Sequence, residues 1–185
     1  IITKVNMIFM SFVIGISQGI QPIIGFNYGA AKYTRVRKTY LLALATATAL
    51  SFVAFGCFQL FPRQIISVFG KGSELYFQFS ERYFRIYMFL TLINGIQPVT
   101  SNFFNSIGKS SLGVFMSLTR QILFLLPLII VFPIFMGIDG VMYAGPIADA
   151  ATGIVCGIFT IRELKELKTL SYTSENAAAA SGSAN

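Results

Sequence analysis

The stretch QPIIGFNYGA at residues 21–30 ends a long apolar segment and runs directly into AKYTRVRK at residues 31–38. No charged residue occurs between positions 5 and 31, and four cations then follow in quick succession: Lys32, Arg35, Arg37 and Lys38. A bilayer is crossed by about 20 helical residues, so the apolar segment is long enough to span it. Basic residues directly after such a segment are typical of the cytoplasmic end of a transmembrane helix.

The composition of the whole chain is that of an integral membrane protein. Hydrophobic residues make up 55% of its 185 residues and charged residues only 11%, with a mean hydropathy of +0.70. Soluble domains carry about 25% charged residues. The net charge of +7 comes from short basic clusters between apolar segments, so we expect no nucleic-acid partner.

Five transmembrane helices of an all-α fold are expected. They cover residues 5–31, 39–62, 80–108, 112–136 and 140–162. We therefore expect residues 1–168 to form one transmembrane unit, followed by a flexible cytoplasmic tail of small and polar residues at 169–185. The chain begins IITKVNMIFM, without an initiator Met, and we expect it to be a fragment of a longer transporter-sized chain.

The basic residues of the loops predict the orientation. Eight follow the first, third and fifth helices and five lie on the other side, which predicts a cytoplasmic C-terminus. Arg120 lies near the cytoplasmic end of the fourth helix, and we expect its side chain to extend to the membrane surface.

Asp149 is the one charged residue between Gly140 and Ile161, inside the expected fifth helix. A carboxylate in hydrocarbon is costly, so such groups normally face the interior of a helix bundle. Three glycines share its helix face: Gly145, Gly153 and Gly157. Small residues let another helix approach closely, which predicts a packed interface at Asp149. Three roles stay open: binding a cation or proton, pairing with Arg120, and capping broken backbone near Pro146.

The expected third helix carries a polar stripe on one face. Its members, at helical spacing, are Asn94, Gln97, Ser101 and Asn105. Pro98 stands among them and frees a backbone carbonyl one turn earlier. The stripe favours the wall of a water-filled cavity, and interhelical hydrogen bonding is the alternative.

The expected first helix combines small, polar and helix-bending residues near its inner end. We expect these to form a bent, closely packed and polar-lined segment: Gln18, Gln21, Pro22, Gly25, Asn27 and Gly29.

Four longer motifs cover most of the chain. They are GISQGIQPIIGFNYGAAKYTRVRK (15–38), YFRIYMFLTLINGIQPVTSNFFNSIGKS (83–110), LTRQILFLLPLIIVFP (118–133) and GIDGVMYAGPIADAATGI (137–154). Together they resemble MATE (multidrug and toxic compound extrusion) transporters of the bacterial subfamily related to DinF. Such transporters have twelve helices in two six-helix lobes. The resemblance covers roughly residues 5–168 and implies that this chain holds helices eight to twelve, most of the C-terminal lobe.

The resemblance also implies a function. The chain would be part of an antiporter that exports amphipathic organic cations by alternating access, in exchange for H⁺ or Na⁺. The polar stripe and Asp149 would line the cavity, and the QPIIGFNYGA bend would help to form the cytoplasmic gate. The implied partners are the N-terminal lobe, membrane lipids, organic cations and the coupling ion, and the implied location is the bacterial inner membrane. Some relatives carry an acidic cation ligand in the tenth helix, where this chain has Asn94, Gln97 and Pro98, so the coupling ion stays open.

Other classes of function fit the sequence less well. A lipid-linked sugar flippase of the same superfamily would line its cavity with several cations for pyrophosphate, and this chain offers only Arg120. An enzyme is not expected, because the chain has no His and no paired carboxylates or metal-ligand spacing within one span. Cys57 and Cys156 both fall in apolar segments, which favours packed side chains over a disulfide or metal site, and we expect no cofactor. An inactive truncated remnant is the remaining alternative.

Overall fold

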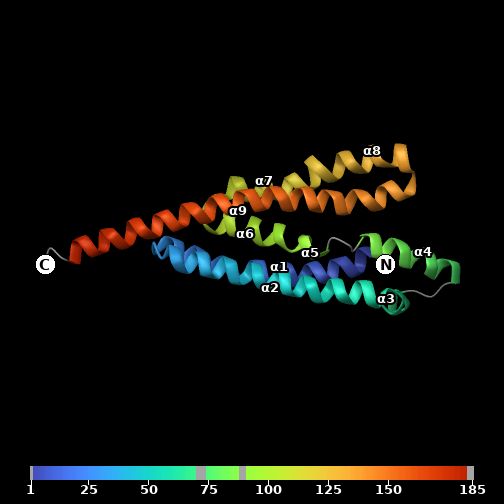
Figure 1. Ribbon diagram of the computed structural model, residues 1–185, viewed down its shortest axis with the longest axis horizontal. Coiled ribbons are helices and arrows are strands. Elements are labelled where there is room, and N and C mark those ends of the chain that lie inside the picture. The colour runs from blue at the N-terminus through green and yellow to red at the C-terminus, as the bar shows by residue number, and fades with distance from the viewer. Residues whose placement is uncertain (1, 70–73, 88–90, 183–185) are drawn as a thin grey trace.

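The computed structural model describes residues 2–69, 74–87 and 91–182, and these residues form helices joined by short turns (Figure 1). The helices of the first half are α1 (Ile2–Gly29), α2 (Tyr33–Leu60), α3 (Pro62–Phe69), α4 (Glu74–Tyr87) and α5 (Thr91–Asn94). The second half contains α6 (Ile96–Ser106), α7 (Ser110–Leu118), the π-helix η1 (Thr119–Leu125), α8 (Leu126–Met136) and α9 (Ile138–Gly182).

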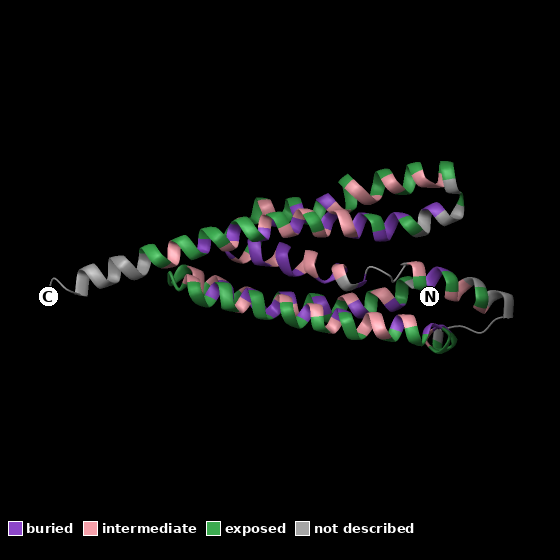
Figure 2. Ribbon diagram, in the orientation of Figure 1, coloured by how far each residue is buried: buried purple, intermediate pink, exposed green. Residues whose placement is uncertain are grey.

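The helices pack into an elongated bundle. α1 and α2 run side by side, and α6 packs against α1 on one side and against α7 and α9 on the other. α9 runs along α8 and η1 and continues beyond the other helices toward the C-terminus (Figure 1). Buried residues face the contacts between helices and exposed residues face outward (Figure 2).

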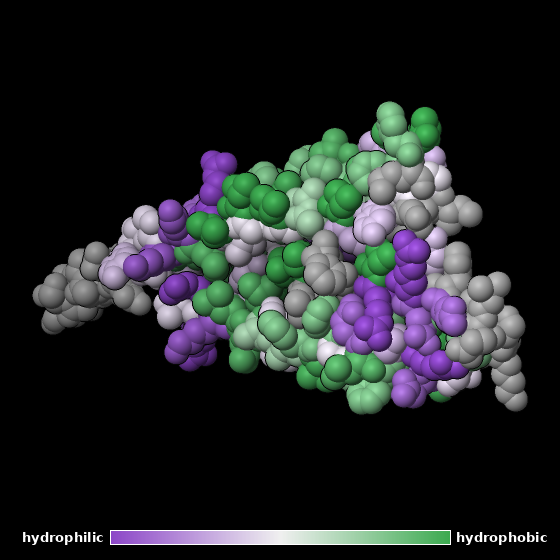
Figure 3. All heavy atoms as spheres, turned by 45° about the vertical axis from the view of Figure 1, so that its right-hand side comes forward, coloured by the Kyte–Doolittle hydropathy of each residue, from purple (hydrophilic) through white to green (hydrophobic). Residues whose placement is uncertain are grey.

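The outward faces are apolar, as a membrane-embedded surface requires. Phe26, Ile134 and Phe135 are 75%, 74% and 82% exposed. In Figure 3 hydrophobic residues form a band across the visible face, and hydrophilic residues gather toward two ends of the molecule. Within the described residues four helical runs are long and apolar enough to cross a membrane: Thr3–Gly29, Tyr33–Leu60, Ser110–Phe135 and Tyr143–Thr173. The chain is therefore an all-α, multi-pass membrane protein.

The helix expected over residues 80–108 is not continuous. Its described parts are α4, α5 and α6, with a break at Gly95, and residues 88–90 lie outside the described residues. Pro98 has no N–H to donate to the carbonyl of Asn94, which weakens the helix at that turn. Gly95 also lies against α2, where a Cβ atom would come within 3.0 Å of the Ser51 hydroxyl oxygen.

The expected fourth helix changes its winding in the middle. η1 separates α7 from α8, and Pro127 follows it directly. Pro127 has no N–H to donate to the carbonyl of Leu123, which removes one α-helical hydrogen bond at this turn. A π-helical turn rotates the residues on either side relative to one another, and such turns often occur at functional sites.

The last helix is longer than expected. We expected it to end near residue 162 and a flexible tail to begin at 169, but α9 is helical to Gly182. Residues 163–181 contain no Gly or Pro, and four consecutive alanines at 177–180 have the highest intrinsic helix propensity. The small residues that suggested a flexible tail therefore favour a helix.

Candidate functional site

A buried ion pair joins the fourth and fifth expected helices. Arg120 Nε lies 2.6 Å from Asp149 Oδ1 and donates a hydrogen bond to it. The side chains are only 21% and 6% exposed. Of the roles left open for Asp149, the structure therefore shows pairing with Arg120. The expectation that Arg120 extends to the membrane surface is wrong, because a buried carboxylate attracts the cation across the helix contact.

The broken third helix adds a polar group to this pair. Asn94, at the end of α5, is buried, and its side chain lies near the Asp149 carboxylate. The approach is close because Gly153, one turn after Asp149, has no side chain where the side chain of Ile93 packs. Arg120, Asp149 and Asn94 form the ion-pair cluster of the bundle interior.

The rest of the expected polar stripe does not join this cluster. Ser101 shares hydrogen bonds with the Gly113 carbonyl oxygen at 2.7 Å and with the Ser117 hydroxyl at 2.8 Å. Asn105 lies beside Gly113, whose missing side chain leaves room for it. Ser101 therefore hydrogen-bonds α6 to α7, whereas Asn105 is an exposed neighbour of Gly113 and Gln97 is half-buried.

A second set of polar contacts joins α6 to α1. Gln21 Nε2 donates to Asn102 Oδ1 at 2.7 Å, and Asn102 Nδ2 donates to Ser17 Oγ at 2.8 Å. Gly25 also faces α6: a Cβ atom placed on it would lie 3.5 Å from the Ser106 carbonyl oxygen, an ordinary van der Waals contact. Gln21 and Gly25 are among the residues expected from the sequence, whereas Asn102 lies outside the expected polar stripe.

The other residues singled out on α1 face elsewhere. Asn27 donates to the Ile23 carbonyl of its own helix at 2.8 Å. Gln18 and Pro22 are exposed, as is Gly29, the last residue of α1. Nothing lies within 4 Å of a Cβ atom placed on Gly15, Gly19 or Gly29, and a Cβ atom on Gly25 would make an ordinary van der Waals contact, so close packing within this chain does not require glycine at these positions.

A neutral hydroxyl cluster lies deep in the bundle. The fully buried Tyr40 of α2 places its hydroxyl 3.0 Å from Thr100 Oγ1 of α6 and 3.0 Å from Thr160 Oγ1 of α9. The sequence does not predict this cluster, because a tyrosine in an apolar helix does not indicate which side chains its hydroxyl will contact.

A more accessible charged cluster lies toward the end of the bundle. Lys109 Nζ donates to both carboxylate oxygens of Glu163, at 2.7 and 2.8 Å, and to Glu166 Oε2 at 3.1 Å. Burial alone would lower the pKa of Lys109, but the hydrogen bonds and charges of the two glutamates raise it above its ordinary value. This cluster ties the turn before α7 to α9.

The described residues offer little for a metal ion. No group of three or more His, Cys, Asp or Glu residues among them is arranged to bind one. Cys57 is exposed and Cys156 is buried, and both are free thiols.

Comparison with known proteins identifies the family. The sequence matches the MatE family model over residues 1–132. It is also 36% identical to the MATE multidrug transporter DinF-BH, whose structure was solved in complex with a ligand, with a TM-score of 0.79 over 85% of this chain. This chain belongs to the MATE family.

Solved MATE structures in two conformations resemble the chain equally well. An outward-facing multidrug resistance transporter of the MOP superfamily is 18% identical with a TM-score of 0.81, and covers 89% of this chain. An inward-facing one is 16% identical with a TM-score of 0.81, and covers 91%. This MATE chain spans only 35% of the length of DinF-BH, 37% of the outward-facing transporter and 39% of the inward-facing one. The comparison with curated protein sequences found no match.

Proposed function

We propose that this chain is most of the C-terminal lobe of a cation-coupled antiporter that exports amphipathic organic cations by alternating access. The observation that carries the proposal is the 36% identity to DinF-BH, a multidrug transporter whose structure holds a bound ligand. The N-terminal lobe of the same transporter would supply the other wall of the cavity. We also propose that the protein lies in the bacterial inner membrane, and the loop charges favour a C-terminus in the cytoplasm.

Alternating access requires a lobe that keeps its fold while it moves. The TM-score of 0.81 to both an outward-facing and an inward-facing transporter supports this requirement, because neither conformation demands a different fold of the part matched here. A lobe of this kind rocks as a rigid unit against its partner, and the bound ligand decides which state is favoured.

Asp149 is the group through which we propose that this lobe contributes to the ion or substrate pathway. Its carboxylate already has a cationic partner, Arg120, and a neutral one, Asn94. A proton or an organic cation that reaches Asp149 would compete with Arg120 for the same carboxylate. Binding of the proton or organic cation would then favour a conformation in which Arg120 is released from Asp149. In this way binding at Asp149 would be coupled to the conformational change. Gln97 would stand beside this route, and Ser101 and Asn105 would hold its wall against α7.

The exposed polar face of α1 would turn toward the N-terminal lobe. Gln18 and Pro22 lie one turn apart and are both exposed. Pro22 has no N–H to donate to the carbonyl of Gln18, and an unsatisfied carbonyl is costly against lipid. We therefore propose that this face lines the aqueous cavity. Gln21 and Gly25 would anchor it to α6, and Asn27 and Gly29 would stand at the cytoplasmic gate.

The flippase alternative is not favoured by the geometry. A pyrophosphate-binding cavity needs several available cations, and Arg120 is already paired with Asp149. The remnant alternative is decided by experiment.

The test is efflux of ethidium, a fluorescent organic cation, from cells that express the chain alone or with an N-terminal MATE lobe restored. We expect efflux only with the restored lobe, and we expect Asp149→Asn to abolish it. Glu166→Gln is the matched control, because it makes the same chemical change on α9 at an exposed position, and it should leave efflux intact. If the two-lobed protein inserts into the membrane and moves no dye, the multidrug proposal fails.

A further inference from the structure

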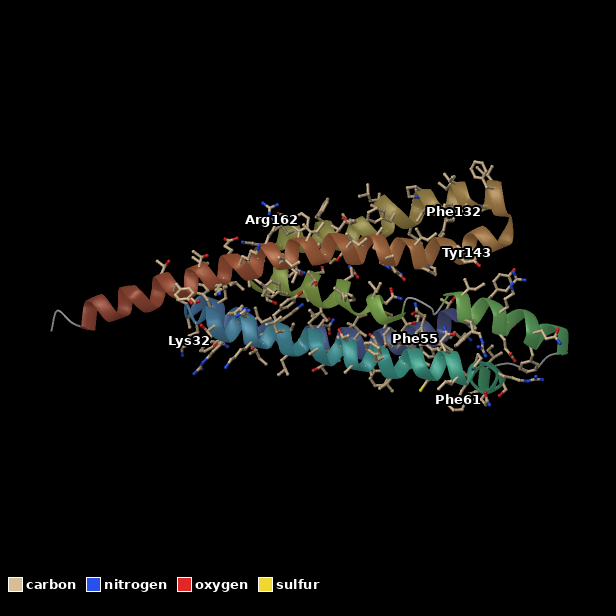
Figure 4. All side chains as sticks on the ribbon, in the orientation of Figure 1. Lys32, Phe55, Phe61, Phe132, Tyr143 and Arg162 are labelled. Atoms are coloured by element: carbon tan, nitrogen blue, oxygen red, sulfur yellow. The ribbon has the colours of Figure 1, made fainter. Side chains whose placement is uncertain are left out.

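A basic pocket opens between the start of α2 and the late part of α9. It has a volume of about 220 Å³ and is lined by Tyr33, Thr34 and Arg37 from α2 and by Lys168 and Tyr172 from α9, among others. Lys32, just before α2, and Arg162 of α9 lie toward the same end of the molecule (Figure 4). Two cations and several hydroxyl groups thus face one cavity from two helices that are distant in sequence.

The positive charge of this pocket is not neutralised. Among the side chains that the structure describes, neither Arg37 nor Lys168 lies in a salt bridge with a carboxylate. Glu163 and Glu166, on the same helix as Lys168, both bind Lys109 instead. The pocket therefore presents two available cations to an anionic ligand.

The position of the pocket relates it to the membrane surface. Leu41 and Leu42, about one turn beyond Arg37 on α2, are exposed apolar residues, and so is Ile161, about two turns before Lys168 on α9. The pocket thus lies where the apolar band ends. Tyr172, at its outer edge, is exposed, and aromatic residues of this kind are typical of the membrane–water interface.

We propose that this pocket binds the phosphate group of an anionic phospholipid. Arg37 offers the planar fork that suits phosphate oxygens, and Lys168 adds a second charge from the facing helix. The first amides of α2, on Tyr33 and Thr34, have no acceptor within the helix and add to the favourable field. The bound lipid would join α2 to α9 outside the hydrocarbon region. The proposal rests on the membrane placement of the chain and not on the proposed transport activity.

The test is lipid binding to the purified chain in detergent micelles, followed by native mass spectrometry. Dioleoylphosphatidylglycerol and dioleoylphosphatidylcholine are compared as probes, because they share the phosphate and differ in net charge. We expect phosphatidylglycerol to bind more tightly and the double variant Arg37→Gln/Lys168→Gln to lose about thirty-fold in its affinity, since each cation near a membrane surface contributes roughly five-fold.

A matched double variant separates a built site from general attraction. Arg35→Gln/Lys165→Gln removes the same two charges from the same two helices, at exposed positions outside the pocket. It should keep most of the affinity. Equal losses in both double variants, or equal binding of the two lipids, would overturn the proposal.

A third arm distinguishes the source of the phosphate. Millimolar inorganic phosphate should displace the lipid only weakly, because it lacks the acyl chains that contact the adjacent apolar surface. If inorganic phosphate binds with an affinity similar to that of the lipid, the pocket is a site for soluble phosphate and the lipid assignment is wrong. Circular dichroism of each variant establishes that it is folded. If the protein with a restored N-terminal lobe moves no ethidium while the chain still binds phosphatidylglycerol, only the transport proposal fails.

Discussion

Two charged clusters on α9 differ in depth and therefore in what they contribute. In the ion-pair cluster, Asp149 is 6% exposed and binds a single cation, Arg120, within the bundle. Toward the end of the bundle Lys109, 31% exposed, binds the 7% exposed Glu163 and the 57% exposed Glu166. The same types of group meet at similar distances in both places, but Lys109 and Glu166 of the second cluster are reached more readily by water and salt, although Glu163 is as buried as Asp149.

This difference in surroundings decides how each cluster responds to change. When one partner of a buried pair is removed, the other remains as an unpaired charge, at a cost of several kcal/mol. An exposed partner that loses its counter-ion is hydrated instead, so exposed pairs contribute at most about 1 kcal/mol. The deep cluster is therefore suited to a step that exchanges one ion for another, and the outer cluster to holding α9 in place.

The largest effect is expected from Asp149→Asn. This change leaves Arg120 without its counter-ion inside the bundle, and the free energy of unfolding should fall by about 3 kcal/mol. The measurement is unfolding in detergent micelles followed by circular dichroism. In the double variant Arg120→Gln/Asp149→Asn no charge is left unpaired, so it should be more stable than Asp149→Asn. Strictly additive losses from the two single changes would show that the pair is not coupled.

Gly113→Ala is expected to disturb the outer part of the bundle without touching a charge. A Cβ atom at Gly113 would lie 2.8 Å from the Ser101 carbonyl oxygen and collide with the side chain of Asn105. We expect a loss of about 2 kcal/mol in the free energy of unfolding, because α7 must move away from α6. The control is Gly56→Ala, where nothing lies within 4 Å of the new atom, and which should gain up to about 1 kcal/mol. Similar values for both variants would contradict the close α6–α7 contact.

Tyr40→Phe tests a buried cluster that carries no charge. The change removes the hydroxyl that Thr100 and Thr160 share. Interhelical hydrogen bonds in membrane proteins average about 0.6 kcal/mol, so we expect a loss of about 1 kcal/mol in stability. Tyr172→Phe, at an exposed position, should change the unfolding free energy by much less. A loss as large as that of Asp149→Asn would show that charge is not what distinguishes the deep cluster.

A smaller effect than that of Asp149→Asn is expected from Lys109→Gln, at about 1–2 kcal/mol, because Lys109 is partly exposed but its partner Glu163 is buried and would lose its cation. Because the pKa of Lys109 is raised in the folded chain, its contribution is present at neutral pH. The stabilising contribution of Lys109 should be lost as the pH rises through that raised pKa, above the ordinary lysine value of 10.5.

The measurement is the unfolding free energy of the wild-type chain and of Lys109→Gln from neutral pH to strongly alkaline pH. The two curves should converge at the alkaline end, and molar salt should bring them closer at neutral pH. Lys165→Gln is the control, and a constant gap across the pH range would exclude a titrating lysine.

The sequence by itself determined the class of the protein and the approximate places of its helices. Long charge-free segments can only be hidden in lipid, and the motifs around residues 15–38 and 137–154 carried the resemblance to MATE transporters, which the MatE match and the 36% identity to DinF-BH confirm. A carboxylate inside an apolar helix also identified Asp149 as a residue that needs a partner. These inferences depend on the local order of residues along the chain, which the sequence contains completely.

Only the tertiary structure decided which side chains meet. Arg120 pairs with Asp149, Asn102 hydrogen-bonds to α1 although it is not part of the expected stripe, and Tyr40 reaches two threonines on other helices. The break at Gly95 and the helical continuation of α9 to Gly182 were likewise outside what hydropathy predicts. The reason is geometric: a polar residue fixes one face of its helix, but the partner it meets depends on the rotation and crossing of a second helix. Those are set by packing contacts from the whole lobe.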